Sequence, residues 1–224
     1  MASVGNSVRK SIADWMVGDF EFSMLHACNA IDGTAAKVLK SNKVGERFRN
    51  LIRNNYDILG PMGMPGIDLH KTKWSVQLGK DGSHTFLDLA EIIYRVHRCT
   101  QGHGAELPKG WELTNDVAKP LRRTRITWEH GKLSLSDRTI FGLLAIAVLT
   151  KENQGQIVPP DYFLSFESRR FPINQWWGRK KDFLSAIHDR VQEIPSLHLD
   201  FSEWTKSPSF DERASCQGAT GEEA

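Results

Sequence analysis

The chain has 224 residues, of which 40% are hydrophobic and 25% are charged, and this composition is typical of a soluble globular protein. Lys and Arg number 29 against 27 Asp and Glu, so the formal charge is +2. That charge argues against a histone-like nucleic-acid binder but leaves room for a local basic patch. The longest apolar stretch, Ile140 to Leu149, is shorter than the roughly 18 residues that a membrane-spanning helix needs.

The three cysteines, Cys28, Cys99 and Cys216, are scattered and form no Cys-x-x-Cys pair. The sequence therefore carries no zinc or redox signature of that type, and we expect neither a metal nor a cofactor. A sparse, odd number of cysteines is typical of reduced thiols. We therefore expect a cytoplasmic protein that is not bound to a membrane.

The first half of the chain shows the three-and-four spacing of amphipathic helices. It predicts a short helix over Val8 to Val17, a long one over Asp19 to Leu39 with Asp19 as N-cap, and a third over Gly45 to Leu59. Gly60 to Gly66 (GPMGMPG) is glycine-rich but lacks the Gly-Lys-Ser/Thr ending of a phosphate-binding loop. We interpret it as a connector.

A further helix is predicted over Phe86 to Thr100, with Thr85 and Asp88 as a capping box. Before it, a short strand is predicted around Trp74 to Leu78. Ile126 to Leu135 alternates around His-Gly and predicts a β-hairpin.

The remaining elements are helical. Arg138 to Lys151 is apolar on nearly every side and predicts a central core helix, and an amphipathic helix is expected over Asn174 to Val191. The expected fold is mainly α, an antiparallel helical bundle with a small β-hairpin. Residues 1–206 form one domain in this prediction, and 207–224, which are small, polar and acidic, form a disordered tail.

One segment is dense in side chains of the catalytic type. On an α-helix Glu91, Arg95 and Arg98 would share one face. His103 follows Arg98 by five residues, and Gly102 between them can end the helix so that the imidazole turns back toward the guanidinium. The two groups could then converge on one phosphate.

Arg98-Cys-Thr-Gln-Gly-His103 resembles the Arg-x4-6-His motif of the HEPN superfamily, at the end of a helix in a helical bundle. The resemblance extends over about Asp19 to Lys151. It implies a metal-independent endoribonuclease, often a dimeric toxin or antiviral effector, whose paired motifs meet at a dimer groove. It therefore implies RNA as substrate, a homodimer, and an antitoxin or regulatory protein as a further partner. Cys99 departs from the family pattern, in which active members often carry a polar residue after the motif arginine.

The chemistry of these side chains fits RNA cleavage without a metal. Imidazole titrates near neutral pH, so His103 is the candidate acid and base at the 2′-oxygen and the 5′-oxygen. Arg98 is the candidate for stabilising the charge on the phosphorane, and Glu91 and Arg95 are candidate supporting residues. The expected products are a 2′,3′-cyclic phosphate and a 5′-hydroxyl.

Simpler interpretations of the same residues stay open. Arg98 and His103 could offset the dipole at a helix C-terminus, and Glu91 and Arg95 could form a salt bridge. Asp32, which is polar within an apolar helix, could pair with a buried arginine. We assign a structural role to His97.

Two clusters of basic residues are candidates for RNA contact, because cations bind phosphates and aromatic rings stack on unpaired bases. Their members are Arg122, Arg123 and Arg125 in one cluster, and Arg179, Lys180 and Lys181, beside Trp176 and Trp177, in the other. The alternative is that they are solvated charges beside core tryptophans.

Two functions of other classes also remain. One is a catalytically inactive HEPN-like module that binds a protein partner or RNA. The other is a helical DNA-binding regulator, which is disfavoured because the sequence shows no helix-turn-helix with a basic recognition helix.

Overall fold

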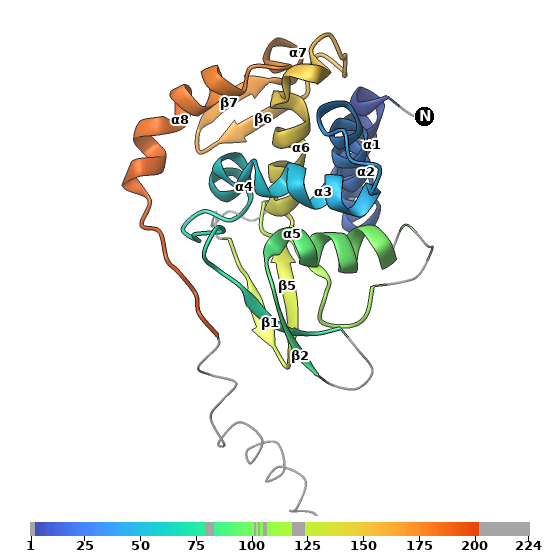
Figure 1. Ribbon diagram of the computed structural model, residues 1–224. Helices are drawn as coiled ribbons and strands as arrows, with labels where there is room; N and C mark the ends of the chain where they lie inside the picture. The colour runs from blue at the N-terminus through green and yellow to red at the C-terminus, as the bar shows by residue number, and fades with distance from the viewer. Residues whose placement is uncertain are drawn as a thin grey trace, which may run out of the picture.

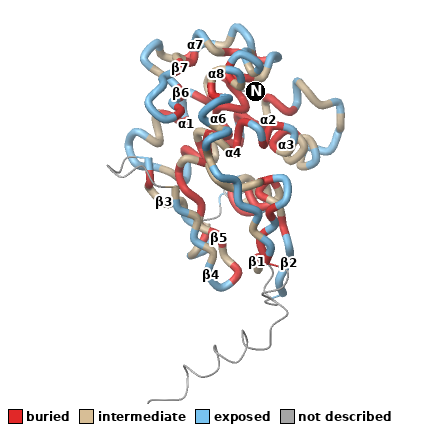
Figure 2. The backbone as a smooth tube through the Cα atoms, turned by 90° about the vertical axis from the view of Figure 1, so that its left-hand side faces the viewer, coloured by how far each residue is buried: buried red, intermediate tan, exposed pale blue. Residues whose placement is uncertain are grey.

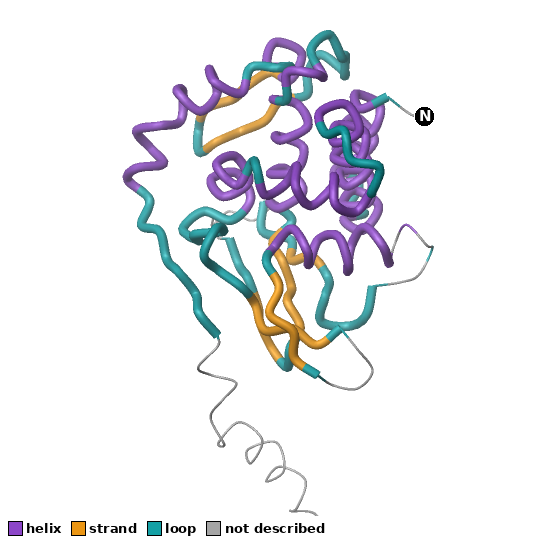
Figure 3. Tube along the Cα trace, in the orientation of Figure 1, coloured by secondary structure: helices purple, strands orange, loops and turns teal. Residues whose placement is uncertain are grey.

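The computed structural model describes residues 3–78, 83–100, 102, 104, 107–117 and 124–201. Over this part of the chain the protein is mainly α-helical, with three small sheets (Figures 1 and 3), so the predicted fold class is confirmed at that level. None of the described helices has the length and hydropathy needed to cross a membrane. The predicted tail 207–224 lies outside the described residues.

Two N-terminal helices pack against a central apolar helix (Figure 1). They are α1 (Val4–Met16) and α2 (Phe20–Val38), and the chain turns between them at Gly18, whose φ is 84°. Asp19 caps α2 as predicted, because its carboxylate accepts a hydrogen bond from the backbone N–H of Phe22 at 3.1 Å. The central helix is α6 (Arg138–Leu149), and buried residues gather where α2, α4 and α6 meet (Figure 2).

The single helix predicted over Gly45 to Leu59 is two helices, α3 (Val44–Arg53) and α4 (Tyr56–Gly63). The side-chain amide of Asn55 donates to the carbonyl of Leu51 at 2.8 Å and so satisfies an acceptor at the end of α3. Since α4 continues to Gly63, the interpretation of Gly60 to Gly66 as a connector is wrong for its first four residues.

The helix predicted over Phe86 to Thr100 begins later and changes type within its length. Phe86 lies in the strand β2 (His84–Leu87), and the helix begins as α5 (Leu89–Ile92), whose N-cap is Asp88 rather than Thr85. From Ile93 to Thr100 the chain is a π-helix, η1, whose hydrogen bonds span five residues instead of four.

Two of the three sheets lie together below the helices (Figure 1). In the first, β1 (Trp74–Gln77) pairs antiparallel with β2. The second has the order β3 (Leu113–Thr114), β5 (Lys132–Ser136), β4 (Thr127–Glu129). The hairpin of β4 and β5 and the strand at β1 confirm two predictions.

The C-terminal part begins with the short 3-10 helix η2 (Lys151–Asn153) and a hairpin of β6 (Phe163–Phe166) and β7 (Arg169–Pro172). The helix predicted over Asn174 to Val191 is α7 (Ile173–Trp176) and α8 (Lys180–Glu193). Gly178, with φ 76°, breaks it because the chain turns there through the left-handed region. After α8 the chain runs beside residues 66–73.

Candidate functional site

Arg98 lies near the end of η1 and is joined to α2. Its Nε donates a hydrogen bond to Oδ2 of Asp32 at 3.0 Å, and both side chains are largely buried. Burial raises the pKa of Asp32, and the hydrogen bond from Arg98 offsets only part of that rise. Burial alone would lower the pKa of Arg98, but the hydrogen bond and charge of Asp32 raise it above its ordinary value. The expected pairing of Asp32 with an arginine is confirmed.

Tyr94 brings a second arginine to the same place, which the sequence did not indicate. The guanidinium carbon of Arg49, on α3, lies 4.7 Å from the centre of the Tyr94 ring, and that of Arg98 lies 5.9 Å away. Gly45 makes room for this ring, since a Cβ there would lie 2.6 Å from Cζ of Tyr94. Burial is the main cause that raises the pKa of Tyr94, and the neighbouring Cys99 raises it further.

Glu91 joins α5 to α3 and to η1. Its carboxylate accepts from Arg95 at 2.7 Å and forms ion pairs with Arg49 at 3.0 Å and Arg53 at 3.5 Å. The expected salt bridge between Glu91 and Arg95 is confirmed. Glu91, Arg95 and Arg98 do not share one α-helical face as expected, because Arg95 and Arg98 lie in the π-helix η1. Glu91 binds the neighbouring helix α3, whereas Arg98 binds α2.

The convergence of His103 on Arg98 cannot be followed, because His103 lies outside the described residues. η1 ends at Thr100, where the predicted helix also ends, but Gly102 does not adopt the left-handed conformation considered for it, since its φ is not positive. Gly104, two residues later, has φ 73° and makes the left-handed turn instead.

His97 is fully buried within η1, and neither ring nitrogen has a hydrogen-bond partner among the described residues. Burial lowers the pKa of His97 to about 4, so the imidazole is neutral at pH 7. An unpaired buried N–H group is unfavourable by roughly 1–3 kcal/mol. A structural role fits the burial of His97 but does not account for its unpaired nitrogens.

The two predicted RNA-contact clusters differ in how far their charges are already paired. Arg122 and Arg123 lie outside the described residues, and Arg125 is bound to the buried carboxylate of Asp116 through its backbone N–H and its Nε, at 2.7 and 2.9 Å. Arg125 therefore closes the base of a loop. This geometry favours the structural interpretation for Arg125.

In the second cluster only one cation lacks a carboxylate among the described residues. Arg179 binds Asp182 at 2.8 Å and its guanidinium carbon lies 4.7 Å from the centre of the Trp176 ring. Lys180 donates to Asn55 at 2.8 Å and Asp57 at 3.1 Å, so it ties α8 to α4. Lys181 is exposed and makes no such contact in this part of the structure.

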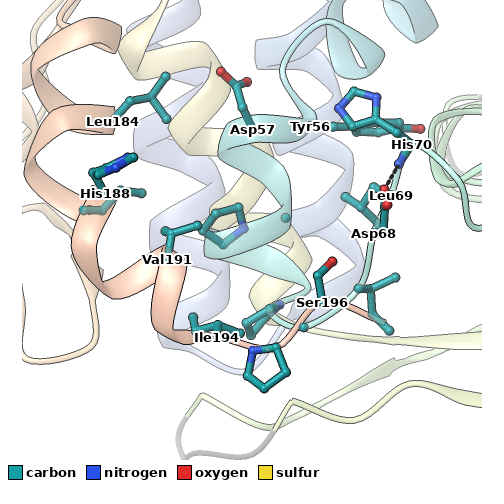
Figure 4. A pocket seen from close by; sticks show the side chains of 17 residues that line it. Tyr56, Asp57, Asp68, Leu69, His70, Leu184, His188, Val191, Ile194 and Ser196 are labelled. Carbon is teal, nitrogen blue, oxygen red and sulfur yellow. Dashed lines mark hydrogen bonds between the residues drawn. The ribbon is translucent and has the colours of Figure 1, made fainter. Parts of the chain in front are cut away.

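A pocket of about 410 Å³ lies between α4 and α8 (Figure 4). Its walls are mostly apolar, and its polar side chains are those of Tyr56, Asp57, Asp68, His70, His188 and Ser196. No sequence pattern indicates this pocket, because it depends on how α8 returns to α4. Across the described residues, no three His, Cys, Asp or Glu side chains gather as a metal site would require.

The chain is similar to proteins from mycobacteria. The family model Rv1289 matches residues 3–205. The chain is 38% identical over 208 residues to "Uncharacterized protein Rv1289" of Mycobacterium tuberculosis (strain ATCC 25618 / H37Rv) and to "Uncharacterized protein Mb1320" of Mycobacterium bovis. These alignments cover 91% of this chain and 97% of each relative. No solved structure matches the chain.

Proposed function

This chain belongs to the Rv1289 family, and we propose that it is a metal-independent endoribonuclease of HEPN-like bundle fold, acting as a toxin or antiviral effector. The proposal assigns the scissile phosphate to Arg98 and the proton transfers to His103. Its support is the motif from Arg98 to His103 together with the geometry around Arg98 and Tyr94.

The single observation that carries the proposal is how Arg98 is held. Asp32 binds only Nε of the Arg98 guanidinium. The two Nη atoms of Arg98 form no hydrogen bond with any described residue. A guanidinium fixed in this way presents two parallel N–H groups, which match two oxygens of a phosphate. Asp32 therefore orients Arg98 without using the side of it that would bind RNA.

Arg49 extends the same surface. Its guanidinium lies against Tyr94, as that of Arg98 does, so two cations lie around one ring. Two arginines around one ring could each bind one of two successive phosphates of the RNA backbone. Glu91, through its contact with Arg49, has the role of positioning that cation, and Arg95 that of a supporting pair.

The proposed reaction needs no metal. The imidazole of His103 takes the proton of the 2′-hydroxyl, the 2′-oxygen forms a bond to phosphorus, and the bond from phosphorus to the 5′-oxygen breaks. The imidazolium, or the same group of a second protomer, returns a proton to that 5′-oxygen. A homodimer would place two such pairs at one groove, and an antitoxin or regulatory protein would block it.

A second candidate is a catalytically inactive HEPN-like module that binds a protein partner or RNA. Two observations favour it. Cys99, which follows Arg98, is not the polar residue that active members often carry there, and Gly102 does not adopt the left-handed conformation that would turn His103 back toward Arg98. Arg98 would then serve mainly to join η1 to α2.

Cleavage of a fluorescent single-stranded RNA in the presence of EDTA separates the two candidates. The ribonuclease requires cleavage by the wild-type protein and a loss of about 10²–10⁴-fold in kcat for His103→Ala. Lys10→Ala is the matched control, because it removes an exposed cation on α1 that belongs to neither candidate RNA-contact cluster. Equal rates for wild type and His103→Ala, or binding without cleavage, would favour the inactive module.

A further inference from the structure

The pocket between α4 and α8 is held open at both ends. At one end Lys180 of α8 binds Asn55 and Asp57 of α4. At the other end Leu197, which follows α8, donates to the carbonyl of Gly66 and accepts from the N–H of Asp68, both at 2.8 Å. Because both ends of α8 are fixed, the gap between them is part of the folded structure rather than the result of a loose helix.

Between these two ends, two apolar side chains of α8 that face the pocket are only partly buried. Of α8 only Phe183 and Ile187 are buried, whereas Leu184 and Val191 face the pocket and are half-buried. Pro61 on α4 also lines the pocket. A cavity of about 410 Å³ is within the size range of small-molecule sites, and a hydrocarbon group is the chemistry that its apolar wall would bind.

The charged residues that line the pocket are carboxylates, each with one lysine partner outside the lining. They are Asp57 and Asp68, and neither Lys nor Arg is among the described residues that line the pocket. Asp68 is already used, because its Oδ1 accepts from the backbone N–H groups of His70 and Lys71 and its Oδ2 lies 3.4 Å from Nζ of Lys71.

Asp57 is the carboxylate that remains available to a ligand. Lys180 binds its Oδ1, and its Oδ2 has no partner among the described residues. Its side chain is 45% exposed, so the contact with Lys180 is a weak surface ion pair that leaves the carboxylate open to a second cation.

We propose that this pocket binds a small hydrophobic amine. The ammonium group lies against Oδ2 of Asp57, and the hydrocarbon part lies along Leu184, Val191 and Pro61. Ligands that carry a phosphate or a carboxylate are disfavoured, since no Lys or Arg lines the pocket and the two lysines beside it, Lys71 and Lys180, already bind its carboxylates. This site is separate from Arg98 and does not depend on the proposed ribonuclease activity.

The test compares three probes of equal chain length, n-hexylammonium, hexan-1-ol and hexanoate, by NMR titration of the whole protein labelled with nitrogen-15. We expect saturable shifts at the α8 residues Ile187 and Val191. Hexylammonium should bind about tenfold more tightly than hexanoate, with the alcohol between them, because attraction is replaced by repulsion at a partly exposed carboxylate. The advantage of hexylammonium should shrink at high salt.

Two variants and a control complete the test. Asp57→Asn should reduce the affinity for hexylammonium to that for hexanol, and Val191→Trp, at a half-buried position, should block all three probes. Asp189→Asn removes an exposed carboxylate of α8 that does not line the pocket and should change nothing. Equal or tighter binding of hexanoate, an unchanged affinity in Asp57→Asn, or no saturable binding of any probe would overturn the proposal.

Discussion

Oδ2 of Asp32 accepts a hydrogen bond from Nε of Arg98 at 3.0 Å, across 66 positions of the sequence. The contact joins the long helix α2 to the end of the π-helix η1. It also fixes the plane of the Arg98 guanidinium, because a hydrogen bond at Nε sets the direction of the two Nη groups. The stability of this region and its proposed chemistry therefore depend on the same pair.

Removing the carboxylate should destabilise the protein. We expect Asp32→Ala to lower the free energy of unfolding by about 1–2 kcal/mol, since it leaves a largely buried guanidinium without its hydrogen bond. Urea denaturation measures the change. Glu21→Ala, at an exposed position of the same helix, is the control and should have little effect. An equal loss in the two variants would show that the Asp32–Arg98 contact contributes nothing.

The burial of His97 predicts a dependence of stability on pH. Its pKa is about 4 in the folded protein against 6.5 for the ordinary group, so the unfolded chain binds the proton more readily between these values. Stability is therefore lost as the pH falls from about 6.5 toward 4, by an amount on the order of 3 kcal/mol.

The variant His97→Leu isolates this contribution. It removes the titrating group and the unpaired nitrogens, so the loss of stability between pH 7 and pH 5 should become smaller than in the wild type. Urea unfolding at several pH values gives the comparison. His198→Gln, at an exposed position, should keep the slope of the wild type. If the unfolding free energy of His97→Leu falls with pH as steeply as that of the wild type, groups other than His97 cause the pH dependence.

Much of the fold follows from local patterns. Asp19 caps α2, and the His130-Gly131 pair makes the turn between β4 and β5 with φ values of 46° and 70°. The break between α3 and α4 and the turn at Gly178 were missed, because helical spacing continues across both. Of two nearby glycines, Gly104 has a positive φ and Gly102 does not, and the sequence pattern does not distinguish them.

The candidate site was only partly predictable for the same reason. Glu91, Arg95 and Arg98 are close in sequence and were found, but their partners Asp32, Arg49 and Arg53 come from α2 and α3. Nothing in the spacing of residues 93–100 distinguishes a π-helix from an α-helix. The pocket between α4 and α8 depends entirely on contacts between distant segments.

The close approach of α4 and α6 requires glycine. A Cβ at Gly142 would lie 2.5 Å from Cδ1 of Leu59 and 3.3 Å from the backbone of Gly63. We expect Gly142→Ala to lower the thermal midpoint, with a cost of about 1–3 kcal/mol. Gly102→Ala is the matched control in a helical residue, because nothing lies within 4 Å of its Cβ, and it should be neutral or stabilising. A stabilised Gly142→Ala protein would contradict this packing.

The two neighbouring lysines of α8 should separate stability from RNA binding. Lys180→Ala removes the contact with Asn55 and Asp57 and should lower the thermal midpoint. Lys181→Ala should leave the thermal midpoint unchanged. It should reduce RNA affinity modestly and make that affinity less dependent on salt, because one phosphate contact is lost. Filter binding at several salt concentrations measures the RNA affinity of each variant. An unchanged affinity would remove Lys181 from the RNA surface.

The ends of the RNA fragments test the proposed reaction most directly. A defined single-stranded RNA is incubated with the wild-type protein in EDTA, and the fragments are identified by mass spectrometry. Attack by the 2′-hydroxyl predicts a 2′,3′-cyclic phosphate on one fragment and a 5′-hydroxyl on the other, with Arg98→Ala slower by about 10²–10³-fold. Fragments that end in a 3′-hydroxyl and a 5′-phosphate, or intact RNA after prolonged incubation, would contradict the account.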